Sequence, residues 1–147
     1  MSKSYDVDKA VSDLIKRAVP EFLVVALDDD SADRPRRIDP RGTVWIRDGE
    51  LAEPDIDLSP PTYHYTHRIP IEIAAYTSSE PLRVVLARMA GRIGDAITVD
   101  RFLGDLVNYI DVTALELVNL NTTNVGGQTQ KGGMFDIVAT YSTNNPL

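Results

Sequence analysis

The feature that most constrains this chain is a segment of alternating side chains over residues 61–77, PTYHYTHRIPIEIAAYT. One face of it carries Tyr63, Tyr65, His67, Ile69, Ile71, Ile73 and Ala75. The other face carries His64, Thr66, Arg68, Glu72 and Tyr76. This alternation predicts a β-strand, and about sixteen residues at about 3.3 Å each would span roughly 50 Å.

A strand of that length does not fit inside a domain of this size. A compact chain of 147 residues is roughly 40 Å across. One interpretation is two shorter strands bent at Pro70, because proline cannot donate a hydrogen bond within a central ladder. The other is an arm whose outer end is completed by a neighbouring subunit. In that case Tyr63, Tyr65 and His67 would meet another subunit. The isoleucines at 69 to 73 would lie in the subunit's own core.

The length and overall composition predict one soluble globular domain over residues 1–147. A hydrophobic content of 43% is enough for one ordinary core. The formal charge of −7 argues against a surface that binds nucleic acid by neutralising phosphates, although DNA could slide past such a surface without sticking. The lack of cysteine excludes disulfides, thiolate catalysis and cysteine-ligated zinc.

The sequence contains no segment with the character of a signal peptide or a membrane span. Its longest strongly apolar run is FLVVAL, residues 22–27, which is far too short to cross a bilayer. We therefore expect synthesis in the cytosol and no membrane partner.

The spacing of apolar residues predicts both helices and strands. Helices are expected over residues 6–18, from a cap at Ser78 or Ser79 to Ala96, and over 101–109. Strands are expected over 22–27, 43–47, 61–77, 114–121 and 135–143, with a hairpin-type turn at 48–49. The intervening segments 28–41, 50–60 and 121–133 are expected to be loops. This order predicts an α+β fold: a mixed, mainly antiparallel sheet of four to five strands, two to three helices packed on one face, and a projecting strand or loop.

Two histidines, His64 and His67, are the candidate catalytic residues. Three positions apart on a strand, they point to opposite faces and cannot chelate one ion together. Neither has an aspartate four residues later, and no G-x-S-x-G motif occurs. We expect no enzyme activity, cofactor or metal, with a small cytosolic enzyme using His64 or His67 as the alternative from another class.

Two loops resemble ligand-binding motifs without matching them. The aspartates of residues 28–33 lack the glycine and glutamate that a calcium loop needs at its sixth and twelfth positions, which predicts a solvated acidic loop. In the glycine-rich segment 126–131, Lys131 lacks the preceding glycine and the following serine or threonine of a phosphate-binding loop. We interpret that segment as a flexible loop that could order on contact with a partner.

The tetrad at residues 91–94, GRIG, superficially fits the GXXG element of KH domains. It continues a helical apolar face that carries Met89 and Ile93, and Asp95 adds negative charge where phosphate would approach. A KH-like nucleic-acid binder is therefore a weak third possibility, and close helix packing at the two glycines is the simpler explanation.

The order of elements resembles that of short tail proteins of siphophages and related prophages. The resemblance rests on the first helix, the block GTVWIRDGELAEPDIDLSPPTYHYTHRIPIEIAAYT, the amphipathic helix after it, LGDLVNYIDV, and the closing FDIVATYSTNNPL. Together these cover most of the chain. Tail terminators of the phage lambda type are the most similar in this respect.

The resemblance implies a virion structural protein that forms a homohexameric ring on the head-proximal end of the tail. Such a ring stops polymerisation of the tail tube protein and joins the tube to the head connector or neck protein, and genome DNA passes through its lumen. A head-completion or neck protein of the same particle is the alternative. We place the subunit or tail interface at Tyr63, Tyr65, His67, Gly126, Gly127 and Lys131. Assembly in the host cytoplasm is expected.

Overall fold

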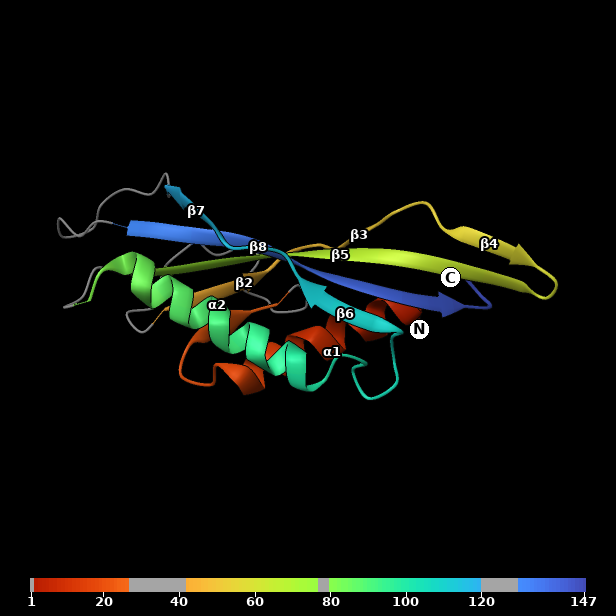
Figure 1. Cartoon of the computed structure of the whole chain (residues 1–147), viewed down its shortest axis with the longest axis horizontal. Helices are drawn as coiled ribbons and strands as arrows, with labels where there is room; N and C mark the ends of the chain where they lie inside the picture. Colours follow the sequence, from red (N-terminus) through yellow and green to blue (C-terminus); the bar gives the residue numbers. More distant parts are fainter. Residues whose placement is uncertain (1, 27–41, 77–79, 120–129) are drawn as a thin grey trace.

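The computed structural model describes residues 2–26, 42–76, 80–119 and 130–147. These residues form an α+β fold in which two helices cover one face of a single eight-stranded mixed sheet (Figure 1). The helices are α1 (Lys3–Ala18) and α2 (Leu82–Val99). The strands are β1 (Leu23–Val25), β2 (Thr43–Ile46), β3 (Glu50–Leu51), β4 (Asp55–Leu58), β5 (Pro61–Tyr76), β6 (Tyr109–Val112), β7 (Glu116–Asn119) and β8 (Gln130–Thr143).

The sheet is built around the antiparallel pair of β5 and β8. These strands stay in register from Tyr63 opposite Thr143 to Tyr76 opposite Gln130. Strands β2, β3 and β4 follow one another along the other edge of β5, and β6 and β7 do so along β8. Strand β1 is parallel to β2, and all the other pairs are antiparallel. The expected fold class is confirmed, but four to five strands was too few because short strands follow both edges of the long pair.

Strand β5 is one continuous strand, so of the two interpretations the one with two shorter strands bent at Pro70 is wrong. The carbonyl oxygen of Pro70 accepts a hydrogen bond from the Arg47 amide at 2.9 Å. Because the N–H and C=O of a strand residue point to the same side, the missing proline donor also faces residues 47–49. There the neighbouring chain bulges: three residues separate Ile46 from Glu50, opposite the two that separate Arg68 from Ile71. Proline is thus accommodated where the ladder is already interrupted.

The hydrophobic core lies between the two helices and one face of the sheet. The helices contribute Val7, Val11, Leu14, Ile15, Leu82, Leu86, Met89, Ile93 and Ile97, which recur at intervals of three or four. The sheet contributes Ile69, Ile71, Ile73, Phe135, Ile137 and Ala139 from the same faces of β5 and β8. The prediction that the isoleucine half of the long strand is buried is confirmed. In the described part of the chain, no helix is long and apolar enough to span a membrane.

Several predicted boundaries were wrong for local reasons. The helix expected over 101–109 is a series of turns, because Leu103, Gly104 and Asp105 all have positive φ angles. Helix α2 has Pro81 as its N-cap with no side-chain cap, and the caps expected at Ser78 or Ser79 lie outside the described residues. The turn expected at 48–49 is the bulge beside Pro70.

The end of the glycine-rich segment is a strand rather than a loop. Residues 131–133 belong to β8 and pair with residues 73–75 of β5. A Cβ atom added to Gly133 would lie 2.7 Å from Leu115 Cδ1, so a larger side chain would collide with a residue that packs on the core. A larger side chain at residue 133 would require the Leu115 side chain to move.

Candidate functional site

The most distinctive surface feature is an arm at one end of the sheet. We define the arm as β4, residues 61–65 of β5 and residues 141–143 of β8. Figure 1 shows these strand ends extending beyond both helices. All four residues of β4 are exposed. Beyond Tyr141, which is buried at the base of the arm, the arm therefore continues the sheet past the point where the subunit's own helices cover it.

The two faces of the arm differ in chemistry. Ile56 lies directly opposite Tyr63, on the face that continues the core. The Ile56 side chain is 50% exposed, and Leu58, two residues further on the same face, is 80% exposed. On the opposite face, Asp57 Oδ2 lies 2.8 Å from His64 Nε2. The arm thus presents apolar side chains on one side and a hydrogen-bonded polar pair on the other.

At the base of the arm, His67 is held inside the subunit. Its side chain is 2% exposed, its Nε2 lies 3.2 Å from Asp8 Oδ1 of α1, and its Nδ1 lies 3.3 Å from the Tyr141 hydroxyl of β8. The buried Asp8 Oδ1 makes no well-aligned hydrogen bond to the described residues, so this contact is an ion pair by distance alone. These contacts join the first helix to the strands that form the arm.

Gly49 also packs against His67, in addition to Asp8 and Tyr141. A Cβ atom added at Gly49 would lie 2.2 Å from His67 Nε2 and 2.8 Å from Cδ2. The bulge at residues 47–49 therefore packs its backbone directly against the imidazole ring. Only glycine permits this approach without movement of the ring.

The phenol of Tyr141 responds to this environment. Burial is the largest cause that raises the pKa of Tyr141; together with the nearby Asp8 carboxylate and Tyr65 it raises this pKa from 10.0 to about 12. The Lys3 ammonium lies 5.7 Å from the centre of the Tyr141 ring, and it donates to the Ser142 carbonyl at 2.8 Å. The start of α1 is thus attached to the arm by both contacts.

The two histidines differ in the properties that a catalytic histidine needs, which are partners for its ring nitrogens and access for a substrate. His67 has a carboxylate on one ring nitrogen and a hydroxyl on the other, an arrangement that can relay a proton, but its burial denies a substrate access. His64 is exposed and has a carboxylate partner, Asp57. Among the described residues, no cluster of His, Asp or Glu could hold a metal ion.

The predicted interface residues do not gather at one place. Tyr63 and Tyr65 are half-buried on the arm, with the Tyr65 and Tyr141 ring centres 6.0 Å apart. His67 lies inside the subunit, so its predicted position at an interface is corrected: its imidazole is already surrounded by its own chain. Lys131 pairs through its backbone with Ala75 near the other end of β8, far along the strand from the arm. Gly126 and Gly127 lie outside the described residues, as do the aspartates of 28–33.

The packing explanation for Gly91 and Gly94 is wrong within the subunit. Both lie inside α2, yet a Cβ atom added at either would have no atom within 4 Å. Glycine inside a helix is less favourable than alanine by about 1 kcal/mol. No contact in the described part of the chain compensates for that cost. The two glycines leave the outer surface of α2 flat.

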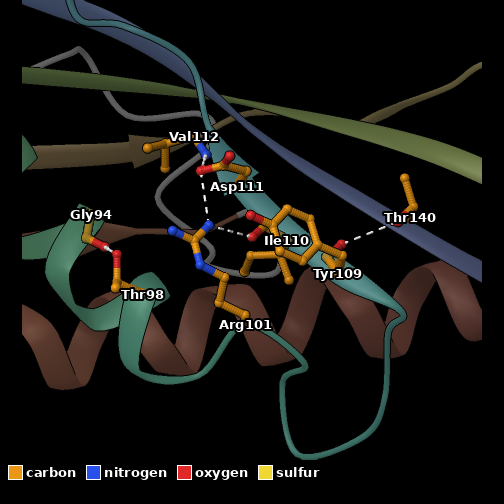
Figure 2. Close-up of polar contacts among 8 residues, drawn as sticks. All are labelled: Gly94, Thr98, Arg101, Tyr109, Ile110, Asp111, Val112 and Thr140. Atoms are coloured by element: carbon orange, nitrogen blue, oxygen red, sulfur yellow. Dashed lines mark hydrogen bonds and ion pairs between the residues drawn. The ribbon is translucent and has the colours of Figure 1, made fainter.

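A second cluster, centred on Arg101, holds the edge strand β6 in place (Figure 2). Arg101 Nη1 lies 3.0 Å from Asp111 Oδ1 and donates to the Ile110 carbonyl at 3.2 Å, and the Ile110 amide donates to the Arg101 carbonyl. The guanidinium lies 5.2 Å from the centre of the Tyr109 ring. The Val112 amide and Arg101 lower the pKa of Asp111. Sequence analysis missed this cluster, because a predicted helix occupied residues 101–109.

Comparison with known proteins adds no family to these observations. No protein-family model matches the chain, and a search of curated proteins finds no similar sequence.

Proposed function

We propose that this chain is a structural subunit of a phage tail: a tail terminator that forms a ring at the head-proximal end of the tail tube. The ring stops tube polymerisation and joins the tube to the head connector or neck protein. A head-completion or neck protein of the same particle is the alternative within this class.

The observation that supports the proposal best is the arm. Strand β4 is exposed along its whole length, and Ile56 and Leu58 leave an apolar surface beyond the reach of the subunit's helices. Apolar side chains that project on a defined, paired strand are typical of an interaction surface. A protein whose role is assembly has a use for such an arm.

The charge of the chain is compatible with a ring around DNA. A formal charge of −7 disfavours adhesion to phosphates, which a lumen for passing DNA must avoid. Repetition of one contact between two different surfaces produces a closed ring when the rotation closes.

The test is electron microscopy and sedimentation of purified protein with tail tubes. We expect the protein to cap one end of each tube and to limit tube length. The variant Ile56→Ser/Leu58→Ser should fold normally and lose capping, because both side chains are exposed. A matched control, Leu51→Ser, changes an exposed leucine of β3 outside the arm and should retain capping. Protein that never binds tube ends would contradict the proposal.

The second candidate, a small enzyme, is favoured by one observation, the exposed His64 with its carboxylate partner Asp57 at 2.8 Å. Substitution of His64 and His67 by alanine separates the two proposals. An enzyme would lose turnover, whereas a ring protein would still cap tubes with the His64→Ala variant.

A further inference from the structure

Strand β4 has one edge that no strand of the described part of the chain pairs with. It pairs with β5 alone, and Figure 1 shows it beyond both helices near one tip of the molecule. All four of its residues are exposed. The free edge of a strand presents a row of backbone N–H and C=O groups, to which another extended chain can bind.

Backbone hydrogen bonds show which residues of β5 face β4. The Thr66 carbonyl accepts from the Ala52 amide at 3.1 Å, and the Pro70 carbonyl accepts from the Arg47 amide at 2.9 Å. Both donors lie on the side of β5 that carries β2, β3 and β4, opposite to β8. Strand β5 pairs with β8 without interruption, so its hydrogen-bonding groups alternate in direction along its whole length. The even-numbered residues of β5 therefore face β4.

This alternation determines which backbone groups of β4 are free. Asp55 and Asp57 lie directly opposite even-numbered residues of β5, so their backbone groups bond to β5. Ile56 and Leu58 lie opposite odd-numbered residues, so their N–H and C=O groups point to the free edge. The same two residues have exposed apolar side chains, 50% for Ile56 and 80% for Leu58. A partner strand would therefore meet backbone groups and apolar side chains at the same residues.

Two prolines limit the length of this free edge. Pro54 precedes β4 and Pro60 follows it, and neither has an N–H to donate. Proteins use prolines and charged residues to keep sheet edges from unlimited pairing. The edge is thus suited to one short strand.

Charge indicates which side chains a partner strand should carry. Asp55 and Asp57 share one face of β4, and Asp57 is paired with His64 at 2.8 Å. Asp55 makes no ion pair with any described residue. Residues directly opposite each other on paired strands share a face, where opposite charges stabilise the pair and like charges destabilise it. Lysine or arginine beside Asp55, with apolar residues beside Ile56 and Leu58, would complement β4.

The described edges of a second copy do not provide such a strand. The other strands with a free edge are β1, β3, β6 and β7, with the sequences LVV, EL, YIDV and ELVN. None of them contains lysine or arginine. Pairing of β4 with the β4 of a second copy would place each aspartate beside another aspartate or beside an apolar residue. Charge therefore favours a segment of another protein.

We infer that β4 binds an extended segment of a partner protein by strand addition. The segment carries lysine or arginine on the face of Asp55 and Asp57, and apolar residues on the face of Ile56 and Leu58. This contact deepens the proposed function, on which it rests only for the identity of the protein that supplies the segment.

Peptide binding to the full chain, measured by calorimetry, tests this contact. The probe is a short capped peptide in which valine alternates with lysine, and the control peptide has glutamate in place of each lysine. We expect the lysine peptide to bind, and to bind more weakly as salt is added. The glutamate peptide should bind about tenfold more weakly or worse, because it places like charges together. Equal binding of the two peptides, binding of neither, or pairing of β4 between copies of the chain would overturn the inference.

Hydrogen exchange measured by NMR tests whether the backbone of β4 takes part. The amides of Ile56 and Leu58 should become protected when the lysine peptide binds, because they point to the free edge. Ile56→Pro removes one of these donors, whereas Ile56→Ala removes only the side chain. The proline variant should bind about three- to tenfold more weakly than the alanine variant, which corresponds to one hydrogen bond. Protection confined to amides outside β4, or equal binding by the two variants, would overturn the inference.

Charge exchange separates recognition by β4 from attraction to the overall charge of −7. Asp55→Lys/Asp57→Lys should reverse the preference, so that the glutamate peptide binds more tightly than the lysine peptide. The control Asp13→Asn changes an exposed carboxylate of α1 and should leave binding unchanged. An unreversed preference, or a loss with Asp13→Asn as large as with Asp55→Asn, would overturn the inference.

The outcome for the tail function is independent of these results. Intact peptide binding with failure of tube capping would contradict only the proposed tail function. Tube capping without peptide binding would overturn only strand addition at β4.

Discussion

The Nε2 atom of His67 lies 3.2 Å from Asp8 Oδ1, and this pair attaches the first helix to the base of the arm. The chain contains a second pair of the same residue types, His64 and Asp57, at 2.8 Å on the exposed face of the arm. One pair is at the edge of the core and the other is in solvent. Their energetic contributions should differ for that reason.

Double-mutant cycles should distinguish these two pairs. For Asp8→Ala with His67→Ala, we expect a coupling of about 0.5–3 kcal/mol, as is usual for residues in one buried network. For Asp57→Ala with His64→Ala, we expect about 1 kcal/mol or less, because solvent screens an exposed pair. Urea denaturation of the single and double variants measures both couplings. Equal couplings would show that burial does not strengthen the His67 pair.

Gly49→Ala should destabilise the fold by about 1–3 kcal/mol, the usual cost of overpacking. The added Cβ would lie 2.2 Å from His67 Nε2, and the ring is enclosed by other contacts. Thermal or urea denaturation measures the loss. In a His67→Ala background the same substitution should cost much less, because the colliding ring is gone. An unchanged cost there would place the cause in the backbone of the bulge.

Tyr141 should make stability fall with rising pH in the alkaline range. The unfolded phenol loses its proton near its ordinary pKa of 10.0, whereas the folded one keeps it to about 12. Between these values the unfolded state binds fewer protons, so the free energy of unfolding decreases as pH rises. Tyr141→Phe should reduce this decline. Urea denaturation across that range measures it, with Tyr63→Phe on the arm as the control.

Arg101→Gln should loosen β6 without unfolding the domain. The substitution removes the pair with Asp111 and the contact with the Tyr109 ring. We expect faster hydrogen exchange at the Ile110 and Val112 amides, measured by NMR. Thr98→Ala, which removes a hydrogen bond to Gly94 on α2, is the control and should leave β6 exchange unchanged.

Asp111 in the Arg101 cluster should make the stability of β6 depend on pH in the acid range. Hydrogen bonding by Val112 and Arg101 lowers the pKa of Asp111 in the folded state. Its stabilising effect is therefore present above the ordinary carboxylate pKa and is lost as pH falls through the folded value. Asp111→Asn should make β6 exchange less sensitive to acid. An unaltered acid response would show that other carboxylates control it.

Strong periodic signals were sufficient for the main elements of the fold. The alternation over residues 61–77 predicted β5, and the spacing from Val7 to Ala18 predicted most of α1. That helix begins earlier than expected because the Ser2 hydroxyl accepts from the Tyr5 amide at 3.4 Å. The apolar face from Leu82 to Ala96 predicted α2.

Weak signals failed where pairing with β5 or β8 overrides local preference. Residues 50–60 are rich in acidic residues and proline, which predicted a connecting loop. Strands β3 and β4 form there instead, because β5 supplies an unpaired edge. The helix expected over 101–109 is absent because Leu103 and Asp105 adopt positive φ angles, which is uncommon for leucine.

The sequence by itself determined that one strand is too long for the domain and that its isoleucine half is buried, because alternation and strand rise depend only on the local chain. Tertiary structure alone decided that β5 remains straight through Pro70, since the bulge at 47–49 removes the need for a donor there. It also decided that His67 turns inward, because Asp8, Tyr141 and Gly49 come from three separate segments. Such a cluster depends on contacts between residues that are far apart in the sequence, so no local sequence pattern predicts it.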